Sequence, residues 1–333
     1  MAEDEYHSGE AVSAVGDQGS APQLPPRPKS ADPQIEGHSS GRETPNTTLK
    51  KQRNQTYMIK KVRWFDTSSQ KFRVSPILVQ NANGPCPLLA LVNALTLSTP
   101  VDVETVLVET LRTREQVSLG LLVDAVFEEL MSGRRGDAAQ GLPDVGDLYS
   151  FLITLHTGMN VNPRFVPNTQ PGVFEETREM RLYSAFNVPL IHGWLPTSES
   201  SAYAAFDRSA KTYEDAQNIQ FYEEELDTKI ASTGLNAEEQ TMFEDLHAIK
   251  QFLITWPTQL TEYGLGVLLA HVKPGDFAIL FRNDHFSTIY KEPRSQQILI
   301  LVTDAGYSSH DEIVWESLVD INGQGTEHYS GDF

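Results

Sequence analysis

The chain contains one cysteine among its 333 residues, and this scarcity excludes several classes of protein. A single thiol cannot form an intramolecular disulfide, and it cannot supply a zinc site built from several cysteines. The sequence also lacks a basic-then-apolar signal at its start and any apolar run of membrane-spanning length. We therefore expect a protein of a reducing compartment, the cytoplasm or also the nucleus, without a membrane partner.

Basic residues are also few. Lys and Arg number 26 against 45 Asp and Glu, which gives a formal net charge of −19. Non-specific binding to nucleic acid requires Lys and Arg to neutralise phosphates, so this balance disfavours a nucleic-acid partner. It is compatible with a protein partner that presents a basic face.

Apolar side chains are scarce in residues 1–54, where Ser, Pro, Gly, Gln and acidic residues dominate. Such a segment buries too little surface to offset its ordering entropy, so we expect a disordered tail. Its proline-rich run, residues 22–28, is interpreted as part of a solvated linker, with a ligand for a proline-binding domain as the alternative. The sequence predicts a folded domain over residues 55–325 and assigns residues 326–333 to the C-terminal end.

The pattern of apolar residues predicts an α+β fold. Alternating or continuous apolar stretches predict strands at 57–64, 72–79, 276–281, 286–290 and 297–304. Helical spacing predicts helices at 103–111, 115–131, 145–156 and 262–272, and a helix that follows the capping sequence 236–239. Most strands come late in the chain, after the helices.

The cysteine lies in the sequence Asn83-Gly84-Pro85-Cys86-Pro87. The Asn-Gly pair favours a turn, and Pro87 suits the first position of a helix that the following leucines predict. A thiol at a helix N-terminus is stabilised as the thiolate. Gln80 precedes it by six residues and can donate an N–H to the same reaction centre. This arrangement is typical of a papain-like cysteine hydrolase, whereas the alternative is a small buried cysteine without a catalytic role.

A histidine partner is expected from the other end of the chain. His285 follows a predicted strand and the polar run Arg282-Asn283-Asp284, a position from which an imidazole can face a cleft. An imidazole holds a catalytic thiolate as an ion pair and then protonates the leaving amine. The alternative is a structural histidine. The tail contains His7 and His38, the C-terminal tip contains His328, and the competing candidates are His156, His192, His247, His271 and His310.

A third group should orient this histidine. The predicted strand 297–304 ends in Thr303 and Asp304, and only one of these side chains can point to the cleft because side chains alternate along a strand. Asp304 would orient the imidazole through its charge, and Thr303 would do so through its hydroxyl. The residues alone leave both open.

Several blocks of the sequence together resemble the MINDY deubiquitinases, cysteine peptidases selective for polyubiquitin joined through lysine 48. The blocks span roughly residues 57–323 and run in the family's order: 80–91, 162–165, 188–195, 260–265, 281–288, 301–304 and 314–318. The resemblance implies a papain-like variant with a helical N-terminal part carrying the nucleophile and a C-terminal β-sheet carrying the histidine.

By resemblance, the catalytic residues are the nucleophile Cys86, the general base His285, the oxyanion donor Gln80 and the supporting residue Thr303. The resemblance also implies that Val161, Trp194 and Phe281 contact ubiquitin, with core packing as the alternative for both aromatic residues. Phe281, Asn283 and His285 are expected to alternate onto one face.

The expected substrate is lysine-48-linked polyubiquitin or a ubiquitinated protein, and the expected enzyme is a monomer that needs no cofactor and no metal. Two other functions are weighed: a ubiquitin-binding scaffold that has lost catalysis, and an unrelated thiol amidase. The acidic segment 213–226 is interpreted as a solvated helical face, because it lacks the spacing of a ubiquitin-interacting helix.

Overall fold

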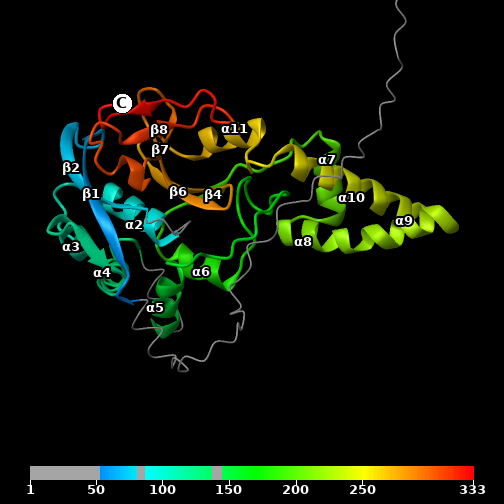
Figure 1. The fold of residues 1–333 in the computed structure, drawn as a ribbon, viewed down its shortest axis with the longest axis horizontal. Coiled ribbons are helices and arrows are strands. Elements are labelled where there is room, and N and C mark those ends of the chain that lie inside the picture. The colour runs from blue at the N-terminus through cyan, green and yellow to red at the C-terminus, as the bar shows by residue number, and fades with distance from the viewer. Residues whose placement is uncertain (1–52, 81–86, 137–144) are drawn as a thin grey trace, which may run out of the picture. The chain divides into compact units, whose positions relative to one another are not determined.

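Two β-sheets enclose a buried helix at the centre of the fold (Figure 1). The computed structural model describes residues 53–80, 87–136 and 145–333, which all belong to one compact unit, Ser40–Phe333. The first sheet has three antiparallel strands in the order β2-β1-β3. These are β1 (Thr56–Asp66), β2 (Lys71–Val79) and β3 (Gln116–Ser118).

The second sheet has six strands in the order β4-β5-β6-β7-β8-β9. Its strands are β4 (Leu190–His192), β5 (Phe277–Arg282), β6 (His285–Lys291), β7 (Ile298–Leu301), β8 (Trp315–Ser317) and β9 (His328–Tyr329). The β4–β5 pair is parallel, and the other pairs are antiparallel. Most of the predicted strands are thus confirmed, including the cluster late in the chain.

Helix α2 (Pro87–Ser98) packs against β2 on one side and against β5 and β6 on the other. It is apolar around its whole circumference, and every residue except Ser98 is buried. A helix of this kind requires neighbours on all sides, which the two sheets provide. The predicted helix start at Pro87 is confirmed.

The remaining helices cover the sheets or pack on one another. Helices α3 (Val106–Arg112), α4 (Leu119–Met131) and α5 (Val145–Thr154) form one group, and α11 (Glu262–His271) packs beside β4. Helix α7 (Ser201–Ser209) packs on α10 (Ala237–Thr255), which follows the capping box predicted at Asn236. The other elements are α6 (Arg178–Ser184), α8 (Tyr213–Asn218), α9 (Glu223–Ser232) and the 3-10 turns η2 (Ile219–Tyr222) and η3 (Ala305–Tyr307). None of the helices in the described part is both long and apolar enough to cross a bilayer.

The structure corrects the prediction of one continuous helix over residues 115–131. Gln116–Ser118 instead forms β3 and pairs with Thr56–Met58 of β1. The Ser118 hydroxyl then accepts the N–H of Leu121, so the helix begins at Leu119. This hydrogen bond satisfies the Leu121 N–H, one of the donors that the first helical turn would otherwise leave unpaired. The N-terminal part therefore contains a sheet as well as helices.

Residues 326–333 are part of the second sheet and its surroundings. Tyr329 accepts the N–H of Val314, and Gly331 accepts the N–H of Phe65. The Phe333 ring stacks on Tyr290 with centroids 5.7 Å apart. The C-terminal end therefore packs into the same core as β1 and β6.

The N-terminus of α11 lies directly against the end of β4. A Cβ at Gly264 would fall 1.7 Å from the carbonyl oxygen of Gly193, so only glycine fits this contact. Thr261 caps the helix by accepting the Gly264 N–H and donates its hydroxyl to the Leu195 carbonyl. The contact therefore fixes the loop before α11 against the sheet.

We predict that Gly264→Ala destabilises the protein by about 3 kcal/mol, because the added methyl group must displace backbone atoms. Gly266→Ala is the matched control, since a Cβ there meets no atom within 4 Å in the same helix. The control should be neutral or slightly stabilising, since alanine favours helix by up to about 1 kcal/mol over glycine. Thermal unfolding of both variants measures the difference, and equal melting temperatures would contradict the prediction.

Candidate active site

Cys86 lies outside the described residues, together with residues 81–85. The structure describes the residues on either side: Gln80, which follows β2 and is half-buried, and Pro87, the first residue of α2. The described part of the candidate site consists of the elements that hold Gln80 and Pro87.

The first of these ends is tied to the predicted supporting strand. The backbone N–H of Gln80 donates to the carbonyl oxygen of Thr303 at 2.7 Å. This hydrogen bond connects the end of β2 in the first sheet to the residues that follow β7 in the second sheet. Two predicted site residues 223 positions apart in sequence are thus in direct contact.

The side chain of Asn93 fixes β2 to α2, a role that was not predicted from the sequence. Its side-chain oxygen accepts the N–H of Leu78 at 2.7 Å, and its side-chain nitrogen donates to the Leu78 carbonyl at 3.0 Å. The side chain is fully buried, so both of its bonds form in a water-free core. The signal in the sequence is one asparagine inside the apolar run 88–97.

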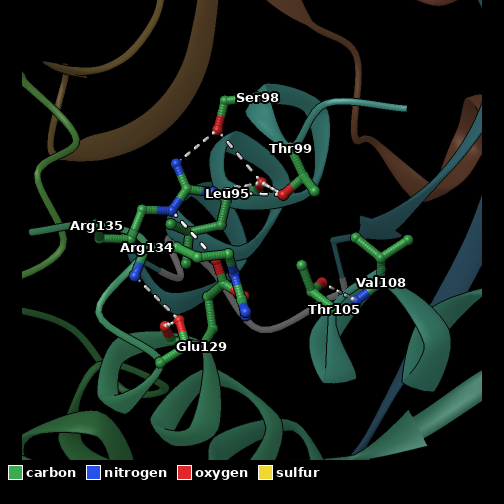
Figure 2. A network of polar contacts seen from close by, with 9 residues as sticks. Leu95, Ser98, Thr99, Thr105, Val108, Glu129, Arg134 and Arg135 are labelled. Carbon is green, nitrogen blue, oxygen red and sulfur yellow. Dashed lines mark hydrogen bonds and ion pairs between the residues drawn. The ribbon is translucent and has the colours of Figure 1, made fainter. Parts of the chain in front are cut away.

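Two arginines satisfy carbonyl groups at the other end of α2. Arg135 donates to the Leu95 carbonyl at 3.0 Å and to the Ser98 hydroxyl at 3.1 Å, as Figure 2 shows. Glu129 of α4 holds Arg135 with a contact of 3.2 Å. From β2, Arg73 donates to the carbonyls of Leu97 and Thr99. Cations at a helix C-terminus stabilise its dipole, and these contacts also fix the position of α2 between its neighbours.

His285 is the first residue of β6, directly after a two-residue hairpin turn. Both turn residues, Asn283 and Asp284, have left-handed φ angles of 53° and 58°, as a type I′ turn requires. Arg282 and His285 form the last pair of the β5–β6 ladder. The His285 side chain is exposed, and within the described part of the chain its ring has no hydrogen-bond partner.

Four of the competing histidines make hydrogen bonds elsewhere, and the ring of the fifth lies tilted against a phenylalanine ring. His192 is 1% exposed, donates from Nε2 to the Val173 carbonyl and accepts the Trp194 N–H at Nδ1. Burial lowers the pKa of His192 to about 4, so it stays neutral. The partners of the other histidines are a tyrosine hydroxyl for His156, a phenylalanine ring for His247, a carbonyl for His271 and a carboxylate for His310.

Thr303 and Asp304 make different contacts. Asp304 is exposed, and its carboxylate accepts the Gly306 N–H at 2.6 Å as the cap of η3. Thr303 is half-buried and bonds Gln80 through its carbonyl. The β6–β7 register pairs Ile289 with Ile300, and its extension toward the hairpin turn would pair Phe286 with Thr303 and His285 with Asp304. Whether Thr303 or Asp304 orients His285 therefore stays a prediction.

The expected alternation of Phe281, Asn283 and His285 onto one face is wrong. The hairpin turn intervenes, so Phe281 pairs with Phe286 and His285 pairs with Arg282. Directly paired residues share a face, so Phe281 and His285 lie on opposite faces of the hairpin. Phe281 is 8% exposed and belongs to the core cluster around α2.

Trp194 is buried as well. It is 5% exposed and packs against Phe165 and Tyr213, with ring centroids 5.2 and 5.5 Å apart. Burial of this extent favours core packing for Trp194 and Phe281. Val161 is half-buried at the edge of the α2 cluster. A ubiquitin contact at these three residues stays a prediction.

A cavity of about 570 Å³ lies beside the C-terminal end of α2, and Arg73, Arg135 and Lys273 are among its lining residues. It contains none of the predicted site residues. It is therefore a separate feature from the candidate active site. In the described ranges, no group of three or more His, Cys, Asp or Glu residues is arranged to hold a metal ion.

The sequence was compared with known proteins. The family model described as MINDY deubiquitinase matches residues 55–333. The chain is 36% identical over 258 residues to "Ubiquitin carboxyl-terminal hydrolase MIY1" of Saccharomyces cerevisiae, covering 77% of this chain and 68% of the relative. It is 34% identical over 272 residues to "Ubiquitin carboxyl-terminal hydrolase MINDY-2" of Mus musculus, covering 81% and 41%. It is 32% identical over 272 residues to "Ubiquitin carboxyl-terminal hydrolase MINDY-1" of Bos taurus, covering 80% and 52%.

These relatives all carry the name of ubiquitin carboxyl-terminal hydrolases, and the site lies on an α+β domain that matches the family model throughout its described length. The chain belongs to the MINDY deubiquitinase family of enzymes. The matched region of this chain covers about half or less of the length of each of the two mammalian relatives.

We predict that His192 makes the fold acid-sensitive. Its pKa in the folded state is about 4, below the ordinary value of 6.5. The unfolded chain therefore binds more protons between these values, and stability falls as the pH drops below about 6.5. The loss from pH 7 to pH 5 should be about 2 kcal/mol for this residue.

His192→Gln should remove this part of the pH dependence, and His247→Gln, at an exposed position on α10, is the control. Urea unfolding at pH 7 and pH 5 gives the two free energies for each protein. If the His192 variant loses as much stability on acidification as the original chain, this residue is not the source.

We predict that Thr303→Val lowers kcat for polyubiquitin more than Asp304→Asn does, by roughly tenfold or more. Valine keeps the shape of threonine and removes the hydroxyl, whereas asparagine retains an oxygen for the η3 cap. Steady-state kinetics of both variants, with folding checked by circular dichroism, measures the difference. A larger loss for Asp304→Asn would assign the orienting role to Asp304.

Proposed function

We propose that this chain hydrolyses the isopeptide bond between the C-terminal glycine of ubiquitin and lysine 48 of the next ubiquitin. The family membership supports ubiquitin as the substrate. The observation that supports the site assignment best is the hydrogen bond from the Gln80 backbone N–H to the Thr303 carbonyl. It ties the segment leading to Cys86 to the strand end expected to support the base.

In the proposed reaction, the Cys86 thiolate attacks the isopeptide carbonyl. The side-chain N–H of Gln80 and a backbone N–H near Cys86 stabilise the oxyanion, and one such donor lowers the barrier by roughly 3 kcal/mol. His285 protonates the departing lysine amine, which leaves a thioester on Cys86. Water then hydrolyses the thioester, releasing the ubiquitin carboxylate and restoring the thiol.

The contacts of α2 support this mechanism. Cys86 directly precedes the first residue of α2, where unsatisfied N–H groups and the helix dipole favour a thiolate. Arg73 and Arg135 hold the opposite end of the helix, and Asn93 holds its middle against β2. A helix held at its middle and at its far end gives a rigid support to the residue that precedes it in sequence.

We further propose that the enzyme acts as a monomer in a reducing compartment, the cytoplasm or also the nucleus. A catalytic free thiol requires such an environment. The net charge of −19 suits the basic surface around the apolar patch of ubiquitin.

We predict that the full chain cleaves lysine-48-linked polyubiquitin in preference to the other linkage types. The test incubates the protein with polyubiquitin of each linkage and follows the products by gel electrophoresis. Cys86→Ala should abolish cleavage and keep binding of the lysine-48-linked polymer, because the change removes only the sulfur atom. A ubiquitin probe with a thiol-reactive C-terminus should label the original protein at Cys86, the only thiol in the chain.

Two outcomes are informative against the proposal. Residual turnover by the alanine variant would overturn the cysteine mechanism. Equal cleavage of several linkages, with full loss in Cys86→Ala, would keep the mechanism and remove the lysine-48 selectivity.

A further inference from the structure

Three non-glycine residues with left-handed backbone angles meet beside His285. Asn283 and Asp284 form the hairpin turn, and Gln259 on a separate loop has a φ angle of 55°. Asparagine and aspartate tolerate this region in hairpin turns, whereas glutamine gains no such local support. A strained residue of this kind persists only where its surroundings hold it, and it is a common feature of functional sites.

Gln259 and Asp284 hold each other by two reciprocal hydrogen bonds. The side-chain nitrogen of Gln259 donates to the Asp284 carboxylate at 3.0 Å, and the backbone N–H of Asp284 donates to the Gln259 side-chain oxygen at 3.0 Å. Gln259 is 8% exposed, so the pair is largely shielded from water on its side. Every polar atom of the Gln259 amide group is thereby directed at the residue before His285.

The strand side of the turn is held by the same loop. The Arg282 guanidinium donates to the carbonyls of Thr258 and Ile321, at 3.3 and 2.6 Å. The Thr258 hydroxyl donates to the Ile321 carbonyl as well, at 3.1 Å. Residues 258 and 259 therefore hold both flanks of the turn that precedes His285.

We infer that Gln259 is a positioning residue that sets the location of the His285 imidazole through Asp284. Gln259 holds both the backbone N–H and the carboxylate of Asp284. The backbone of His285 follows Asp284 directly, so a shift of His285 would strain or break the Gln259–Asp284 pair. The inference rests on the proposed catalytic role of His285. A general base loses efficiency when its ring is displaced by about 1 Å, which can lower the rate roughly a hundredfold.

The test begins with Gln259→Ala, which removes both bonds of the pair. We expect kcat for lysine-48-linked diubiquitin to fall roughly ten- to hundredfold with KM nearly unchanged, because binding does not depend on the imidazole. Gln296→Ala is the matched control: Gln296 also has a left-handed φ, of 62°, but its side chain bonds only the Pro293 carbonyl in the exposed turn between β6 and β7. All assays are run where circular dichroism shows each variant to be fully folded.

Two substitutions at Asp284 separate the pair from the turn. Asp284→Gly preserves the left-handed backbone and removes the carboxylate, so it should lower kcat as Gln259→Ala does. Asp284→Asn preserves both the turn and an acceptor oxygen, so it should recover most of kcat. The double variant Gln259→Ala, Asp284→Gly should be no worse than the poorer single variant, because both changes break the same interaction.

A second readout does not require ubiquitin. The chain has one thiol, so the rate of alkylation by iodoacetamide between pH 5 and pH 9 reports Cys86 alone. An imidazole partner keeps the thiolate reactive at low pH, and His285→Ala gives the profile without it. Gln259→Ala and Asp284→Gly should shift the profile toward that of His285→Ala, whereas Gln296→Ala should keep the original profile.

The outcomes separate this inference from the proposed function. If the original chain and His285→Ala share one alkylation profile and neither cleaves ubiquitin, the proposed function fails. If the original chain is active and Gln259→Ala keeps kcat within about twofold with an unshifted profile, the positioning role of Gln259 is overturned.

Discussion

The complete burial of helix α2 is the constraint on which the rest of the structure depends. A helix without a solvent face depends on neighbouring elements to satisfy its polar groups, because an unpaired group in a dry core is unfavourable; among the described residues the Thr96 hydroxyl is an exception. Asn93 therefore bonds Leu78 of β2, and the Ala90 carbonyl accepts the hydroxyl of Thr288 from β6 at 2.9 Å. These contacts join both sheets to the helix that follows Cys86, so the core and the candidate site share one set of bonds.

A second consequence concerns how the segments of the site reach one another. The residues that follow β2 and those that follow β7 come after strands of different sheets, which pack on α2 and also directly on each other through Trp64, Tyr290 and Trp315. The Gln80–Thr303 bond links the residues that follow β2 and β7 directly. On the histidine side, the loop residues Thr258 and Gln259 bond Arg282 and Asp284 of the type I′ turn and so fix the turn in place. Rigid supports of this kind suit a reaction in which two groups must be held in hydrogen-bond range.

The sequence predicts the α+β class, the start of α2 and most strands, because these follow from periodicity and from the proline after Cys86. It does not predict β3, because Gln116–Ser118 pairs only with a strand some 60 positions earlier. Asn283 and Asp284 both favour left-handed angles, and they form a tight turn where the expectation had an uninterrupted alternation. The turn puts Phe281 on the face opposite to His285. Gln259 gives no local signal, since its role depends on a turn 25 residues away.

Several of the few basic residues in the described part of the chain have a structural role. Several of the few cations are directed inward to satisfy carbonyl groups: Lys60 bonds the carbonyls of Tyr307, His310 and Ile313, and burial lowers its pKa. Lys291 similarly bonds the Leu269 carbonyl, and Arg73 and Arg135 bond the end of α2. These cations keep their charge and so count in the net charge of −19, but they are withdrawn from direct contact with a partner. A partner with a basic face would therefore be attracted over long range, while the reaction itself depends on the contacts around α2.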